Sequence, residues 1–134
     1  MRKRPALPMR RERDIQRAIL DLLHARCVLA WKAGSGGFRV TDTRGRARYV
    51  KMGQTGVADL IGVIAWCVTH DTPGSDATAP ACVTTGRFLA IEVKRPGEHA
   101  TVEQADFLRN VRQSGGLAFV AHSCEEVAKE LGWT

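Results

Sequence analysis

The first apolar residues of the chain recur at helical spacing. They follow one another at steps of three and four residues: Ile15, Ala18, Ile19, Leu22 and Leu23. Such steps place apolar side chains on one stripe of a helix, so the pattern predicts a helix from Arg11 to about Ala25 with one buried face. Glu12 falls on the first turn, in line with that stripe.

Later apolar segments predict the strands of a sheet. The segment from Cys27 to Trp31 is short and partly β-branched, and the run from Leu60 to Val68 is almost unbroken, as expected of a central strand covered on both faces. A second central strand is predicted from Phe88 to Lys94 and a third buried strand from Leu117. Residues 71–86 are rich in Pro, Thr, Ala and Gly, which favours an exposed loop or the tip of a hairpin.

Two capping patterns predict the remaining helices. Thr101 with Gln104 three positions later forms a capping box for a helix that runs to about Ser114. Ser123 with Glu126 caps a short last helix that ends near Leu131. The order helix, strands, helix, strand, helix predicts an α/β fold with a mixed central sheet flanked by helices.

A basic hairpin is predicted between residues 38 and 51, with its turn at Thr43–Gly45. Two interpretations of its charges are equally open: they bind phosphates, or they keep a solvated edge from aggregating. The basic residues concerned are Arg39, Arg44, Arg46, Arg48 and Lys51.

Length favours a single domain, and the basic charge suits a polyanionic partner such as nucleic acid without identifying one. The chain has 134 residues, with 20 Lys and Arg against 14 Asp and Glu, a formal charge of +6. We expect residues 1–10, which are basic and contain two prolines, to form a flexible arm and residues 11–134 to form one domain. Without an apolar signal segment or a long apolar span, we expect a soluble cytoplasmic protein associated with the nucleoid.

The four cysteines are widely spaced: Cys27, Cys67, Cys82 and Cys124. None of them forms a C-x-x-C pair, and no histidine follows at the spacing of a zinc finger, so a structural zinc site is not expected. We expect buried, reduced thiols instead.

The residues with chemical potential lie at strand ends. Glu92 and Lys94 are two positions apart, so both side chains point to one face of their strand while Ile91 and Val93 point to the other. Asp59 directly precedes the neighbouring apolar strand, and pairing of the two strands could bring its carboxylate beside Glu92. Two crowded carboxylates repel each other, and a hard divalent cation such as Mg²⁺ relieves that repulsion.

These motifs, in this order, resemble the VRR-Nuc domain proteins of the PD-(D/E)xK nuclease superfamily, which are encoded by bacteria and phages and are similar to Holliday junction resolvases. Four segments carry the resemblance: E-R-D-I-Q-R-A-I-L from Glu12, G-Q-T-G-V-A-D-L-I-G from Gly53, I-E-V-K-R-P-G from Ile91, and T-V-E-Q-A-D-F-L from Thr101. Ala58 stands where a proline often precedes the aspartate. The resemblance implies a restriction-endonuclease-like core.

The resemblance also implies roles for individual residues. Asp59, Glu92, the backbone carbonyl of Val93 and Glu12 would hold Mg²⁺ or Mn²⁺. Lys94 would orient the attacking water and offset negative charge, and Gln104 would support it; the alternative for Gln104 is the capping box alone. Asp14 rivals Glu12 as the acid of the first helix, and favourable charge at a helix N-terminus would explain both. Arg95 joins the hairpin residues as a predicted DNA contact.

The implied activity is metal-dependent endonuclease cleavage of branched or junction DNA, in DNA repair or recombination. Symmetric cutting of a junction would call for a homodimer. One alternative is a catalytically silent DNA-binding module of the same fold within a larger nucleic-acid assembly. Another is an RNA-binding or ribosome-associated basic protein, which would explain the charge but not the paired acids.

Overall fold

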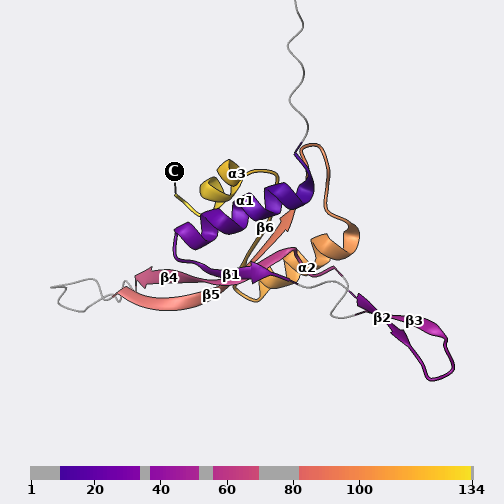
Figure 1. Cartoon of the computed structure of the whole chain (residues 1–134). Coiled ribbons are helices and arrows are strands. Elements are labelled where there is room, and N and C mark those ends of the chain that lie inside the picture. Colours follow the sequence, from indigo (N-terminus) through magenta and orange to yellow (C-terminus); the bar gives the residue numbers. More distant parts are fainter. Residues whose placement is uncertain (1–9, 34–36, 52–55, 70–81, 134) are drawn as a thin grey trace, which may run out of the picture.

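The computed structural model describes residues 10–33, 37–51, 56–69 and 82–133 (Figure 1). The elements follow in the order α1 (Glu12–Ala25), β1 (Leu29–Lys32), β2 (Gly37–Thr41), β3 (Ala47–Lys51), β4 (Leu60–Thr69), β5 (Cys82–Val93), α2 (Val102–Gln113), β6 (Leu117–Ala121) and α3 (Cys124–Glu130).

The central sheet is mixed, as predicted. Its strand order is β1-β4-β5-β6. The pairs β1–β4 and β4–β5 are antiparallel, whereas β6 runs parallel to β5. The parallel pair needs a crossover, which α2 provides, because a tight turn can connect only antiparallel neighbours. The result is a mixed α/β fold with helices on both faces of the sheet (Figure 1).

The two faces of the sheet have separate apolar cores. Side chains alternate along a strand, so Leu89, Ile91 and Val93 of β5 point to one face, where they pack with Ile19 and Leu23 of α1. Helix α3 adds its own apolar residues to this core. On the opposite face a smaller core joins the sheet to α2 through these buried residues: Ala58, Ala90, Leu108 and Ala118.

Both predicted helix caps are present. The Thr101 hydroxyl accepts a hydrogen bond from the Gln104 backbone amide at 3.3 Å, and the Gln104 side-chain oxygen accepts one from the Thr101 amide at 2.8 Å. This capping box starts α2 as the sequence predicts. The Ser123 hydroxyl likewise accepts from the Glu126 amide at 3.2 Å and starts α3.

The predicted basic hairpin is confirmed as a separate two-stranded sheet, β2–β3, in which Thr41 pairs with Ala47. Asp42 closes its turn, because one carboxylate oxygen accepts hydrogen bonds from the backbone amides of Arg44 and Arg46, both at 2.9 Å. Gly45 follows with a φ of +76°, a conformation that glycine adopts without a steric cost.

Two strand predictions need correction. Strand β5 begins at Cys82, not at Phe88, because the β-branched residues 83–85 pair with β4. The segment that follows Ile64 in β4 is not covered on both faces: Ala65, Trp66 and Cys67 are exposed. These far halves of β4 and β5 project beyond the described helices, where no helix can bury them (Figure 1).

The expectation of buried free thiols is wrong for two cysteines. Cys27 is free but exposed, and Cys67 is disulfide-bonded. Cys124 is free and half-buried. Among the described residues, no helix has the length and apolar character needed to cross a membrane. The predicted arm lies outside the described residues, apart from Arg10.

Candidate active site

The register of β4 and β5 brings the two predicted carboxylates together. Leu60 pairs with Ile91, so Asp59, one residue before Leu60, lies opposite Glu92 in the same antiparallel register. The Asp59 backbone carbonyl accepts a hydrogen bond from the Ala33 amide at 2.8 Å, which ties it to the end of β1. Its side-chain oxygen Oδ2 accepts from the Val93 amide at 2.9 Å. Both bonds hold Asp59 at the sheet end.

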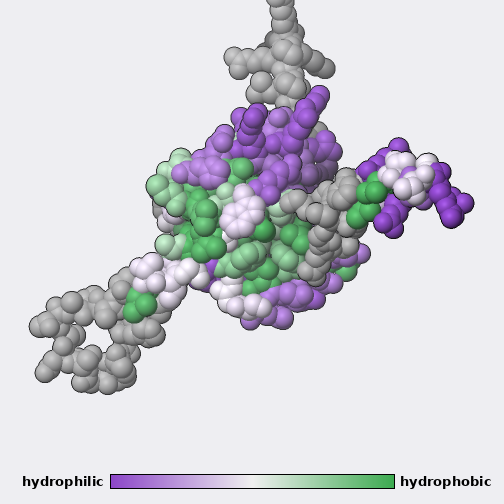
Figure 2. Space-filling view, turned by 60° about the horizontal axis from the view of Figure 1, so that its bottom comes forward, coloured by the Kyte–Doolittle hydropathy of each residue, from purple (hydrophilic) through white to green (hydrophobic). Residues whose placement is uncertain are grey.

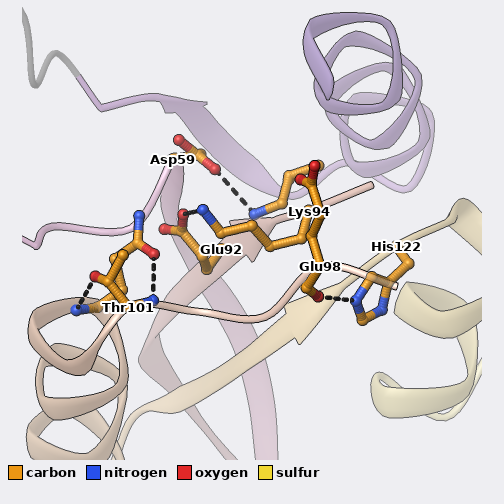
Figure 3. A network of polar contacts seen from close by, with 8 residues as sticks. Asp59, Glu92, Lys94, Glu98, Thr101 and His122 are labelled. Atoms are coloured by element: carbon orange, nitrogen blue, oxygen red, sulfur yellow. Dashed lines mark hydrogen bonds and ion pairs between the residues drawn. The ribbon is translucent and has the colours of Figure 1, made fainter. Parts of the chain in front are cut away.

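Lys94 lies just beyond the end of β5 and is held by the neighbouring strand. Its backbone amide donates to the Ala121 carbonyl at 3.0 Å, which continues the ladder to β6 by one bond. Its ammonium nitrogen lies 3.3 Å from Glu92 Oε1. The side chains are 14% and 1% exposed respectively, so the lysine covers the carboxylate from the solvent side (Figure 3).

The surroundings of the Glu92 carboxyl group disfavour its charged form. Burial, and then the nearby charge of Asp59, raise its pKa to about 7, although Lys94 acts in the opposite direction. Its oxygen Oε2 is buried and has no hydrogen-bond partner. A carboxylate with one unpaired oxygen and an adjacent carboxylate is suited to a hard cation, which would satisfy that oxygen and offset both charges.

The residues at this site would supply some of the ligands that a divalent cation needs. Asp59 and Glu92 are brought together as predicted, and both supply the oxygen atoms that Mg²⁺ and Mn²⁺ prefer. Over the described ranges no group of three or more His, Cys, Asp or Glu residues could hold a metal. Glu12 is therefore not gathered with the pair; its charge instead acts on Arg95, whose pKa it helps to raise after the larger effect of Glu98.

Gln104 and Arg95 both have other partners in this structure. The Gln104 side-chain oxygen accepts from the Thr101 amide, the capping interaction that was one of its two predicted roles. Arg95 is exposed and forms an ion pair with Glu98 at 2.6 Å. Their predicted roles beside Lys94 and at the DNA remain predictions.

His122 was missed by the sequence analysis. It follows β6 directly, and its Nε2 lies 3.0 Å from the Glu98 carbonyl oxygen (Figure 3). Its Nδ1 lies 3.0 Å from a Glu126 carboxylate oxygen. Both partners accept hydrogen bonds, and only an imidazolium can donate to both at once. The backbone bond to Glu98 and the bond to Glu126 accordingly raise the pKa of His122. The residue therefore anchors the loop that follows Lys94.

The predicted DNA contacts on the hairpin are available to solvent. Arg39, Arg44, Arg46 and Arg48 are exposed on β2, β3 and their turn, whereas the side chain of Lys51 lies outside what the structure describes. Figure 2 shows hydrophilic surface on the hairpin and over α1, with a hydrophobic area on the sheet between them. Exposed apolar residues of that sheet include Leu29, Trp31 and Val63.

Comparisons of the chain with protein-family models, with curated proteins and with solved structures gave no significant match.

Proposed function

We propose that this protein is a divalent-metal-dependent DNA endonuclease with a restriction-endonuclease-like core. The observation that carries the proposal is the group at the end of β4 and β5. There Asp59 lies beside Glu92, whose Oε2 is buried and unpaired, and the Lys94 ammonium nitrogen lies 3.3 Å from the other oxygen of Glu92. Two acids and a lysine in this arrangement suit phosphodiester hydrolysis.

Asp59 and Glu92 would hold Mg²⁺ or Mn²⁺, with the Val93 carbonyl as a further oxygen ligand. When bound, the cation would lower the pKa of a water molecule and offset charge on the phosphate. The hydrogen bond from the Val93 amide to Asp59 Oδ2 orients one carboxylate before any cation binds. Orientation in advance matters because a preformed site loses less conformational freedom on binding.

Lys94 would act on the water and on the phosphate. Its ammonium group has three donor hydrogens. One can be directed to Glu92 Oε1, and the others can orient the attacking water and stabilise the negative charge that develops on the phosphate. Its 14% exposure leaves it accessible to a substrate at the rim of the site.

The substrate proposed is DNA, with branched or junction DNA preferred. The basic hairpin β2–β3 and the overall charge of +6 favour a polyanion. No base-reading motif was found in the sequence, so recognition would depend on backbone contacts and DNA shape. A homodimer would allow both strands of a junction to be cut.

The test is cleavage of a labelled four-way junction and of the matching linear duplex. We expect cleavage in Mg²⁺ or Mn²⁺, and binding without cleavage in Ca²⁺, which is larger and less strict in its geometry. Full activity in a chelator would contradict the proposal. Metal-independent DNA binding with no cleavage of either substrate would instead favour the silent DNA-binding module.

A further inference from the structure

A cavity lies between α1 and the pair β1–β4, at the end of the sheet that carries the candidate active site. Its volume is about 190 Å³, roughly six times the 30 Å³ that one water molecule occupies in the liquid. It therefore has room for a phosphate group with part of its hydration. The described residues that line it are Arg13, Gln16, Arg17, Leu20, Lys32 and Leu60.

The helical residues of this cavity lie on one face of α1. Arg13, Gln16, Arg17 and Leu20 are spaced by three, four and seven residues, and side chains at these steps are neighbours on a helix. This face adjoins the buried stripe that includes Ile15 and Ile19. The arginines therefore stand at the edge of the helix where it meets the sheet.

The charged side chains among the described residues of the cavity lining are all positive. Arg13, Arg17 and Lys32 are all exposed, and no acidic side chain is among the described residues that line the cavity. Among the described parts of the chain, none of the three forms an ion pair; the ion pairs present involve Lys94, Arg95, Arg109 and His122. Three unpaired cations around one hollow attract an anion.

Gln16 adds a polar side chain to the cavity wall. Its side chain is only 8% exposed although it lies in the cavity wall, and its oxygen Oε1 is buried without a hydrogen-bond partner. Leaving an amide oxygen unpaired is costly. Because Oε1 is buried, the NH₂ group is the part of the amide that can donate to an anion in the cavity.

The position of the cavity links it to the proposed chemistry. Lys32 pairs with Leu60 across β1 and β4, and the next residue of each strand end, Ala33 and Asp59, share a hydrogen bond. The cavity therefore lies at the same end of the sheet as Asp59 and Glu92 but on the face covered by α1, because side chains alternate along β4. A DNA backbone that crosses this end of the sheet can place one phosphate at the carboxylates and another at the cavity.

We propose that this cavity binds a non-scissile phosphodiester group of the DNA backbone, through Arg13, Arg17 and Lys32, with the Gln16 amide at its floor. The inference rests on the proposed function for the identity of the DNA. The cavity fixes the register of the strand relative to the metal-binding carboxylates and carries no sequence preference.

The experiment measures binding of a fluorescein-labelled four-way junction to the full chain by anisotropy, in chelator, over a series of salt concentrations. The variant is Arg13→Ala with Arg17→Ala. The control is Arg109→Ala with Lys129→Ala, which removes the same charge from α2 and α3. Circular dichroism and thermal melting check that both double variants are folded.

We expect the cavity variant to bind roughly tenfold more weakly than the control and to lower the slope of log affinity against log salt by about one, because both arginines contact the same phosphate. Gln16→Glu, which places a negative charge in the cavity wall, should weaken binding as well, whereas Gln16→Leu should weaken it less. Equal affinities and slopes for the cavity variant and the control would overturn the proposal.

Two further results separate the possible failures. Competition by submillimolar inorganic phosphate at constant ionic strength would assign the cavity to a small phosphate compound and overturn the DNA proposal; we expect none. If the wild type cleaves DNA with Mg²⁺ but the cavity variant behaves as the control, the cavity proposal alone fails. If the wild type never cleaves but the cavity variant loses affinity and slope, the nuclease proposal fails and the phosphate site remains.

Discussion

The two ends of the β4–β5 ladder differ sharply although the same two strands form both. At one end Leu60, Leu89 and Ile91 are almost fully buried between helices on either face. At the other end Trp66 is 37% and Val83 48% exposed, with no described helix against them. Hydrogen-bonded pairing continues along both halves, so the backbone does not account for the difference.

Burial distinguishes the near end of the ladder, at Leu60 and Ile91, from the far end, at Trp66 and Val83, and the candidate site lies at the near end. Helical cover at the near end removes Glu92 from water, and this burial is the largest cause of its raised pKa. A carboxylate at the far end would keep its hydration and its ordinary pKa. Glu92 Oε2 is also buried there without a hydrogen-bond partner, which is the basis for proposing that this end holds a cation.

The largest expected effect concerns stability. Ile91→Ala at the near end should cost about 2–5 kcal/mol of unfolding free energy, because it opens a cavity in the larger core. Val83→Ala at the far end should change it by less than about 0.5 kcal/mol. Urea denaturation of the metal-free protein measures both values. Similar losses for the two variants would remove the distinction between the ends.

The second prediction compares the DNA cleavage rates of variants at two positions along β5. Lys94→Ala should lower the single-turnover cleavage rate by at least roughly a hundredfold while DNA binding in Ca²⁺ persists, because the lysine acts on water and phosphate. Arg87→Ala removes the same charge from β5 farther from the site, where the side chain contacts Gly115 and Trp66, and should leave the rate nearly unchanged. Near wild-type cleavage by Lys94→Ala would show that the lysine takes no part in catalysis and only packs at the end of β5.

The pH dependence of stability gives a third, smaller effect. The pKa of Glu92 is raised, so between about pH 4.5 and 7 the folded state holds a proton that the unfolded state has released. The unfolding free energy of the metal-free protein should therefore fall as pH rises through this window, by on the order of 3 kcal/mol at most. Glu92→Gln should remove the decline and be the more stable protein at pH 8.

The control for this prediction is Glu130→Gln, an exposed position of α3, which should retain the wild-type decline. Thermal melting across the pH range in chelator would measure all three proteins. A Glu92→Gln variant that loses stability at pH 8 would show that the carboxylate is better satisfied than its unpaired oxygen indicates.

The smallest expected effect concerns the hairpin β2–β3, which lies outside both ends of the ladder. Arg46→Ala with Arg48→Ala should reduce the salt slope of DNA binding by about two if these exposed arginines contact phosphates. Anisotropy titrations over a salt series would measure it. An unchanged slope would indicate that these charges only keep a solvated strand edge from aggregating.

Sequence patterns were sufficient where the contacts are local or follow from strand pairing. The stripe of α1, the capping box at Thr101 and the juxtaposition of Asp59 and Glu92 were all predicted, the last because two apolar strands must pair in some register. The start of β5 was misplaced, since Pro- and Gly-rich neighbours obscured the β-branched residues 83–85.

Contacts between distant segments could not be predicted. His122 bonds to Glu98, 24 residues away in sequence, and nothing in the residues around either one signals this contact. The cavity of Arg13, Arg17 and Lys32 needs the packing of α1 on β1. The burial of Glu92, which is 1% exposed, likewise depends on how the chain packs around the sheet end. Such features arise from tertiary packing, which local propensity does not encode.

The account's central claim is that Asp59 and Glu92 hold a divalent cation, and calorimetric titration with Mn²⁺ tests it most directly. The wild type near pH 7 should bind the ion and release part of a proton from Glu92, so the measured heat should vary with the ionisation enthalpy of the buffer. Asp59→Asn should lose that binding, whereas Asp106→Asn should retain it, because Asp106 lies on α2 with a side chain that is 48% exposed. Binding by Asp59→Asn that equals the wild type in affinity and proton release would contradict the claim.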